Sequence, residues 1–211
     1  MRSHPSRPRT PGALVSLLAC LLLGTVALGG CSSLEGSGDK GYVTSDGQVE
    51  VVAPADRGEP IELEGEDLDG KPLSLADLRG QPVVVNVWWS ACPPCRVEQP
   101  DLTEAAAELE GDAAFVGLNI RDSSSDQANA YVRTFDVPYP SFYSADGKAL
   151  VPFYGTLTAY TVPATVVLDA EGRIAASVLG ALPSKQTLVD LVNDTAAEAA
   201  ADDAAAGEDA S

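Results

Sequence analysis

The stretch from residue 82 to residue 100 constrains the fold of this chain more than any other. It reads PVVVNVWWSACPPCRVEQP, and its first seven residues are apolar apart from Asn86 and mostly β-branched, which predicts a buried strand. Ser90 and Ala91 then predict a turn, and Cys92 and Cys95 open a helical pattern. A cysteine at a helix N-terminus lies near unpaired N–H groups and the positive end of the helix dipole, which stabilise a thiolate. This order of elements therefore indicates thiol–disulfide chemistry.

Two other interpretations of this cysteine pair are a structural disulfide and a metal site. A disulfide that closes so short a loop gains little stability by the loop-entropy argument. A structural zinc site needs about four ligands, but the chain has a single histidine, His4, and its other cysteines are Cys20 and Cys31. Redox chemistry is the favoured interpretation, and no metal or other cofactor is expected.

The N-terminal residues predict export and attachment to a membrane. Residues 1–30 form a basic start followed by an apolar run at 13–28, which is shorter than the ~20 residues that span a bilayer. The end of this run, LGGC, resembles a bacterial lipobox and predicts a lipoprotein signal peptide with Cys31 as the lipidated residue. An ordinary secretory signal or an anchor helix is the alternative. The expected location is the outer face of the cytoplasmic membrane.

Composition divides the remaining chain into three parts. Residues 31–58 are rich in glycine, serine and acids and predict a flexible linker, whereas residues 59–193 contain the strand and helix patterns. Residues 194–211 are mostly alanine and acids; extension of the last helix is one interpretation, but the segment lacks large apolar residues to bury, so an acidic, disordered tail is expected. The net charge of −18 argues against binding to nucleic acid or to anionic lipid.

Residues 59–193 predict an α/β domain. The favoured strands are 82–88, 113–120, 164–169 and 174–179, with an edge strand at 61–64 and a short strand at 139–143. The favoured helices follow Cys92, cover 124–135 and lie near 188–192, with a partial helix at 148–154. Strands that alternate with helices and end in a hairpin and a helix give a sandwich with a central mixed sheet flanked by helices.

Three segments together resemble a known family. They are DGKPLSLADLRG at 69–80, the strand and CPPCRVEQP motif at 84–100, and VPATVVLDAEGRI at 162–174. In this order they resemble TlpA/ResA-like thioredoxins with a redoxin/AhpC-TSA-like domain, which are membrane-anchored thiol–disulfide oxidoreductases. The resemblance implies a thioredoxin-like sandwich with an N-terminal β extension and a central insertion. One departure is Ala91, where the family usually carries an aromatic residue.

The positions of the cysteines suggest separate roles. Cys92 is nearest the helix dipole and is expected to be the more exposed, attacking thiolate, whereas Cys95 is expected to resolve the mixed disulfide. The resemblance places Glu98 beneath the cysteines, where a carboxylate would raise the pKa of a thiol and accept a proton from Cys95. The alternative is an exposed helical glutamate.

The resemblance also implies a binding surface. Pro163 matches the proline that is cis in thioredoxin folds, which would leave the Val162 backbone free to pair with an extended substrate; the alternative is a trans proline that opens a strand. Of the two tryptophans, one is expected in the core and one at the rim of the site, so Trp89 is a candidate for substrate binding. Asn86 falls where cytosolic thioredoxins place a buried acid, and a buried amide needs partners.

The favoured function is that of an extracytoplasmic, lipid-anchored oxidoreductase that reduces disulfides of exported apo-proteins. The resemblance implies apocytochrome c as a client and a membrane thiol carrier as the electron donor. The dipeptide Pro93-Pro94 resembles that of reducing family members. A disulfide-forming oxidase or isomerase is one alternative, and a non-catalytic thioredoxin-fold binding lipoprotein is another. A monomer without a nucleic-acid partner is expected.

Overall fold

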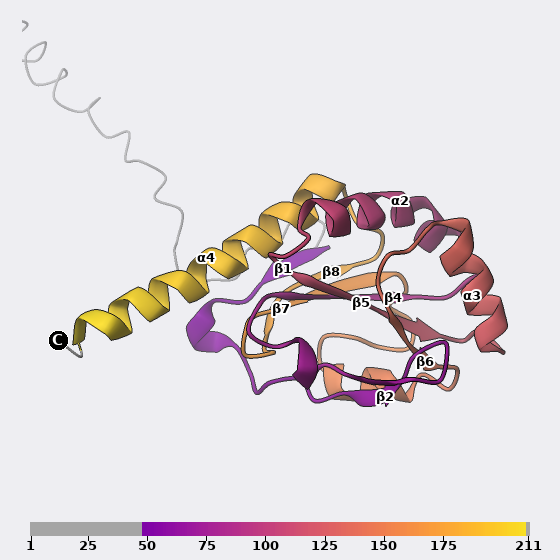
Figure 1. Cartoon of the computed structure of the whole chain (residues 1–211), viewed down its shortest axis with the longest axis horizontal. Coiled ribbons are helices and arrows are strands. Elements are labelled where there is room, and N and C mark those ends of the chain that lie inside the picture. Colours follow the sequence, from indigo (N-terminus) through magenta and orange to yellow (C-terminus); the bar gives the residue numbers. More distant parts are fainter. Residues whose placement is uncertain (1–47, 210–211) are drawn as a thin grey trace, which may run out of the picture. The chain divides into compact units, whose positions relative to one another are not determined.

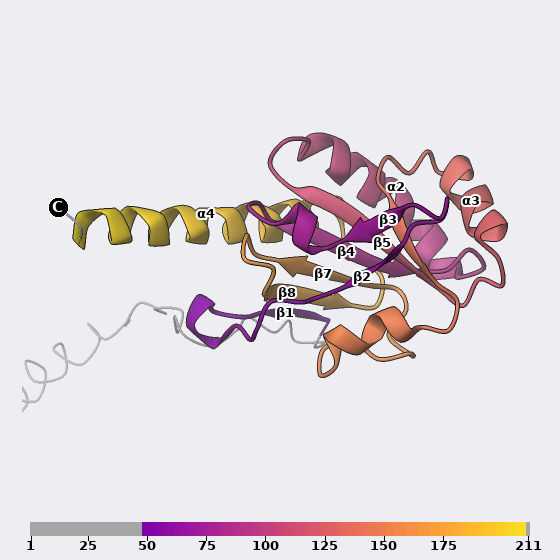
Figure 2. The ribbon, with the colours of Figure 1, turned by 60° about the horizontal axis from the view of Figure 1, so that its bottom comes forward.

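A six-stranded mixed sheet forms the centre of the protein. The computed structural model describes residues 48–209, so the predicted signal peptide, Cys31 and the first part of the linker lie outside the described residues. The strand order is β1-β8-β7-β4-β5-β6, with β4, β5 and β6 parallel and the other pairs antiparallel (Figures 1 and 2). The strands are β1 (Val49–Val51), β4 (Val83–Trp88), β5 (Ala114–Ile120), β6 (Ser141–Ser144), β7 (Ala164–Leu168) and β8 (Ile174–Leu179).

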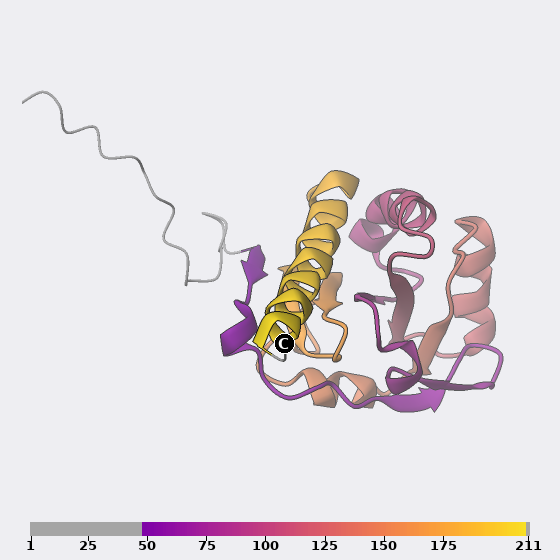
Figure 3. The same cartoon turned by 60° about the vertical axis from the view of Figure 1, so that its left-hand side comes forward.

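Helices cover one face of this sheet, and short elements cover the other (Figures 1 and 3). The helices are α2 (Pro93–Glu108), α3 (Ser125–Thr134) and α4 (Lys185–Asp209). The short elements are a two-stranded sheet of β2 (Glu64–Glu66) and β3 (Pro72–Ser74) and the 3₁₀ helices η2 (Ala76–Leu78) and η3 (Lys148–Phe153), while η1 (Pro54–Asp56) follows β1. Because β4 is covered on both faces, all six of its residues are buried.

The predicted thioredoxin-like α/β sandwich is confirmed, including its additions. The β2–β3 pair forms the N-terminal β extension, and α3, β6 and η3 form the central insertion between β5 and β7. At the centre, β5 carries Gly117, whose missing side chain makes room for its neighbours. A Cβ there would lie 2.1 Å from Ser141 Oγ and 2.6 Å from Trp88 Nε1. Glycine is therefore required for the Trp88 indole to pack against β5.

The folded region begins earlier than predicted. The predicted flexible linker, 31–58, includes β1, because Val49 and Val51 pair with the edge of β8. Val49 lies opposite Val178, Val178 opposite Thr165, and Thr165 opposite Asn86, so these four residues form one row across the sheet. β8 runs in the same direction as β4, and β1 is antiparallel to both. The chain therefore enters the sheet at the end of the strands where β4 finishes.

The folded region also ends later than predicted. Helix α4 continues to Asp209, where residues 194–211 were expected to be disordered. Alanine favours helix, and two polar residues beyond 193 have partners in the domain. Thr195 is buried, and Glu198 forms an ion pair with Arg57, whose side chain also pairs with Asp169. None of the helices within residues 48–209 is both long and apolar enough to cross a membrane.

Candidate functional site

Cys92 and Cys95 form a disulfide at the N-terminus of α2, with their Cα atoms 5.3 Å apart. Cys92 is the N-cap residue, and its Sγ accepts a hydrogen bond from the Cys95 N–H at 3.2 Å. Cys92 was expected to be the more exposed cysteine, but in this oxidised form both are buried and barely differ, with Cys92 2% and Cys95 1% exposed. Both pack into a cluster with Trp88 and Tyr131, which removes them from solvent.

Aromatic side chains from β4 and α3 support the disulfide. The Trp88 ring stacks on the Tyr131 ring with centroids 4.4 Å apart, and the Tyr131 hydroxyl donates a hydrogen bond to the Cys95 carbonyl at 2.9 Å. Trp88 is buried and Trp89 is half-buried, which confirms one core and one rim tryptophan. Sequence reasoning missed Tyr131, although its spacing from Ala128 marks the buried face of α3.

Glu98 lies one turn after Cys95 on α2 and is only 3% exposed, so it is not an exposed helical glutamate. Its Oε2 accepts the Leu182 N–H at 2.8 Å, and its Oε1 accepts the Asn86 amide at 3.1 Å. Desolvation raises the pKa of Glu98 from 4.5 to about 7, although the two hydrogen bonds oppose the shift. A buried carboxyl with a pKa near neutrality can both hold and release a proton under ordinary conditions.

Asn86 joins three elements beneath the cysteines. It is 2% exposed, and its Nδ2 lies 3.1 Å from Glu98 Oε1, 3.1 Å from Thr165 Oγ1 and 3.4 Å from the Ala164 carbonyl. The amide nitrogen therefore has the partners that its burial requires, whereas Asn86 Oδ1 is buried and has no hydrogen-bond partner among the described residues. The amide nitrogen links β4 to α2 and to β7 and orients the Glu98 carboxyl.

The Val162–Pro163 peptide bond is cis, as predicted. Pro163 directly precedes β7, whose first residue, Ala164, lies opposite Val87 at the edge where β4 ends. Val162 packs against the cluster around the cysteines. Its N–H donates to the Tyr160 carbonyl at 3.1 Å, so within residues 48–209 only its carbonyl is left to pair with an extended segment.

A buried carboxylate fixes the turn before Cys92. Asp122 follows β5 and is 1% exposed; it accepts hydrogen bonds from the Ser90 N–H at 2.9 Å, the Ser90 hydroxyl at 2.7 Å and the Asn119 amide at 2.8 Å. Sequence reasoning missed this residue. An acid directly after a buried strand that runs parallel to β4 was the available clue, because parallel strands end at the same edge of a sheet.

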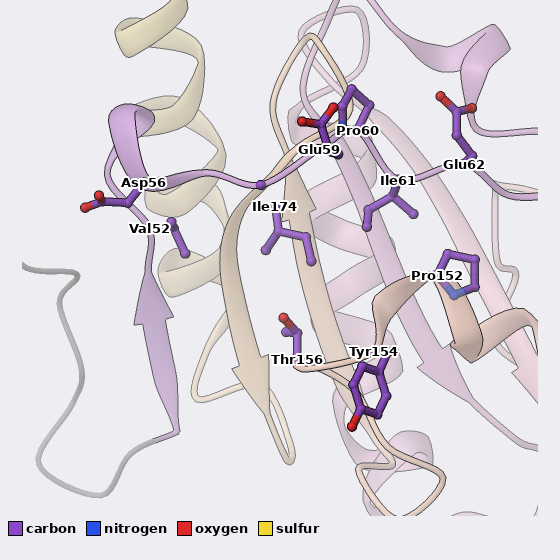
Figure 4. Close-up of a pocket in the computed structure, with 11 residues that line it drawn as sticks. Val52, Asp56, Glu59, Pro60, Ile61, Glu62, Pro152, Tyr154, Thr156 and Ile174 are labelled. Carbon is purple, nitrogen blue, oxygen red and sulfur yellow. The ribbon is translucent and has the colours of Figure 1, made fainter.

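The other candidate features lie elsewhere or are absent from the described residues. A pocket of about 550 Å³ is lined by Asp56, Glu59, Tyr154 and neighbouring residues (Figure 4), and neither cysteine lines it. Within residues 48–209, no group of three or more His, Cys, Asp or Glu side chains is arranged to hold a metal ion. The groups that the structure brings together at the site are the two cysteines, Glu98 and Asn86.

The chain is similar in sequence to known proteins. The redoxin family model matches residues 48–194. The chain is 36% identical to the thiol:disulfide interchange protein HelX of Rhodobacter capsulatus over 132 residues, which are 62% of this chain and 67% of HelX. It is 35% identical to the thiol:disulfide interchange protein DsbE of Pseudomonas aeruginosa over 114 residues, 54% of this chain and 59% of DsbE. Proteins named thiol-disulfide oxidoreductase ResA from Bacillus species also match.

A solved structure extends the likeness over more of the fold. The DsbF homologue of Corynebacterium diphtheriae is 32% identical and superposes with a TM-score of 0.67, covering 74% of this chain and 98% of that protein. The redoxin match covers most of the chain and includes both cysteines and Pro163. The chain therefore belongs to the redoxin family, among thiol–disulfide oxidoreductases of the DsbE and ResA type.

Proposed function

We propose that this protein is an extracytoplasmic oxidoreductase, anchored by a lipid on Cys31, that reduces disulfides in exported apo-proteins. The observation that carries the proposal is the Cys92–Cys95 disulfide at the N-terminus of α2, with buried Glu98 one turn below it. The resemblance to TlpA/ResA-like thioredoxins favours apocytochrome c as a client. The protein spans only 59% of the length of the Pseudomonas DsbE.

The proposed reaction transfers two electrons from the dithiol to the client. The Cys92 thiolate attacks one client sulfur, which forms a mixed disulfide and releases the other client sulfur as a thiolate. Glu98 accepts the proton of the Cys95 thiol. The Cys95 thiolate then attacks Cys92 Sγ, which forms the intramolecular disulfide and releases the second client thiolate. A membrane thiol carrier, itself oxidised in turn, reduces the Cys92–Cys95 disulfide again.

Substitution of each cysteine tests this reaction. Cys92→Ser should abolish the reduction of insulin disulfides, whereas Cys95→Ser should accumulate a mixed disulfide that gel electrophoresis and mass spectrometry identify. Cys31→Ser is the matched control: it should keep the reductase activity but move the protein from the membrane fraction to the soluble fraction. Insulin reduction by the Cys92→Ser variant at the wild-type rate would contradict the role of Cys92, and a wild-type rate no higher than background would favour a non-catalytic binding role.

A disulfide-forming oxidase or isomerase is the second candidate. A structural relative, 28% identical, is described as a secreted thiol-disulfide isomerase from Corynebacterium glutamicum. The reduction potential of the Cys92–Cys95 couple distinguishes the candidates when it is measured by equilibration with a glutathione buffer. A value near that of thioredoxin (~−270 mV) supports the reductant, and a value near that of DsbA (~−120 mV) supports the oxidant.

A further inference from the structure

Most cations in the described part of the chain have a carboxylate partner. Six of its lysines and arginines form ion pairs with Asp or Glu: Arg57, Lys71, Arg79, Lys148, Arg173 and Lys185. Within residues 48–209, only Arg96, Arg121 and Arg133 have no carboxylate within ion-pair distance. In a protein with a net charge of −18, three arginines without an acidic partner need an explanation.

Arg96 lies beside the disulfide on the α3 side. It follows Cys95 directly and is exposed, and its Nη1 donates a hydrogen bond to the Ser90 carbonyl at 3.2 Å. Its guanidinium carbon lies 5.0 Å from the centre of the Phe135 ring and 5.7 Å from that of Tyr131. Aromatic faces and a carbonyl hold the guanidinium in place without neutralising its charge.

Arg121 lies on the other flank, beside the loop that leads to Pro163. It is exposed, and its Nη2 donates a hydrogen bond to the Ala159 carbonyl. Its guanidinium carbon lies 6.0 Å from the centre of the Trp89 ring. Arg121 and Arg96 thus contact Trp89 and Ser90, which precede Cys92 by three and two positions, and both arginines keep an uncompensated positive charge.

We propose that Arg96 and Arg121, which we call the arginine rim, select client polypeptides that carry acidic residues next to the disulfide to be reduced. This inference rests on the proposed reductase function and names the class of client. At physiological ionic strength charges are screened over about 8 Å, so the many distant carboxylates of this chain repel a client only weakly. The rim charges act at contact distance, and their fixed positions reduce the entropy lost when a carboxylate binds.

Paired peptide substrates test the arginine rim. Two synthetic disulfide peptides would differ only in the residues that flank the cysteines, Asp and Glu in one and Asn and Gln in the other. The full chain in its reduced form should reduce the acidic peptide with the higher kcat/KM. The expected preference is about two- to fivefold for each arginine, which is the range of an exposed ion pair. Added salt should diminish it.

The preference is the ratio of the two kcat/KM values, so a change that affects both peptides equally cancels. The double variant Arg96→Gln/Arg121→Gln should bring the ratio close to one. Arg133→Gln is the matched control, because Arg133 also lacks a carboxylate partner within residues 48–209 but makes no contact with the turn before Cys92. It should keep the wild-type ratio.

Three results would overturn the inference while leaving the proposed function intact. They are equal rates for the two peptides in the wild type, an unchanged preference in the double variant, and an equal loss of preference in Arg133→Gln. The last of these would show that the total charge of the protein, and not the rim, decides the preference. If the wild type reduces neither peptide, the proposed function itself is refuted, and this inference with it.

Discussion

Replacement of Glu98 with glutamine should change how the stability of the oxidised protein depends on pH. Glu98 has a pKa of about 7 in the folded protein and about 4.5 when it is exposed on unfolding. Between these values the folded state binds the proton more tightly than the unfolded state. Its contribution to stability is therefore fully present below pH 4.5 and is lost as the pH rises through 7.

The size of this effect follows from the two pKa values. Each pKa unit corresponds to about 1.4 kcal/mol, so Glu98 alone lowers the free energy of unfolding by about 2.5 kcal/mol between pH 5 and pH 8. Glutamine does not ionise, so the Glu98→Gln variant should not lose this stability as the pH rises. The glutamine carbonyl can accept the Leu182 N–H, but its amide faces the donor Nδ2 of Asn86, so Asn86 must turn its amide over for the unpartnered Oδ1 to accept a hydrogen bond from glutamine.

Urea unfolding of wild type and Glu98→Gln, with the disulfide intact, measures the difference at each pH. The free energy of unfolding of Glu98→Gln should rise by about 2.5 kcal/mol relative to that of wild type between pH 5 and pH 8. This change does not depend on how far the two proteins differ at pH 5. Glu110→Gln, at an exposed residue just after α2, is the control and should follow the wild-type curve. Parallel curves for Glu98→Gln and wild type would refute the view that burial neutralises this carboxyl.

Two further substitutions test the packing that positions the site. Gly117→Ala places a Cβ 2.1 Å from Ser141 Oγ and should lower the free energy of unfolding by about 1–3 kcal/mol. Ser141→Ala in the same chain should recover part of this lost stability. If it recovers none, contact with Ser141 Oγ is not the cause of the loss. Arg57→Met removes one of the two arginines paired with buried Asp169. Because Asp169 keeps Arg173, the change should cost about 1–3 kcal/mol in urea unfolding, against less than about 0.5 kcal/mol for exposed Arg133→Met; equal costs would contradict the buried pair.

The parts of the site that lie close together in the sequence were predictable. The strand, turn and first helical turn around Cys92 are encoded by neighbouring residues, and the family resemblance supplied the cis bond at Pro163 and the position of Glu98. The exposure of Cys92 was not predictable from its place at the helix start, because the aromatic cover comes from α3. Tyr131 reaches the Cys95 carbonyl across 36 positions, and Asp122 reaches Ser90 across 32.

The predicted domain bounds, 59–193, leave out β1 and the last part of α4 for a related reason. The composition of residues 31–58 and of the region after 193 predicts flexible segments, but composition does not show which residues meet. Arg57 and Glu198 are 141 positions apart in the sequence, and their ion pair joins both ends of the domain. Short strands such as β1 also carry too few residues for a period-two pattern to stand out.

The place where the chain enters the sheet limits how far from the membrane surface the Cys92–Cys95 pair can act. Val49 lies in the same row as Asn86, three strands away, so about 15 Å across the strands separates the start of β1 from β4, the strand that leads to the cysteines. With a lipid on Cys31 as proposed, residues 32–48 span at most about 60 Å when fully extended. The dithiol can then act only on disulfides that come within about 75 Å of the membrane surface.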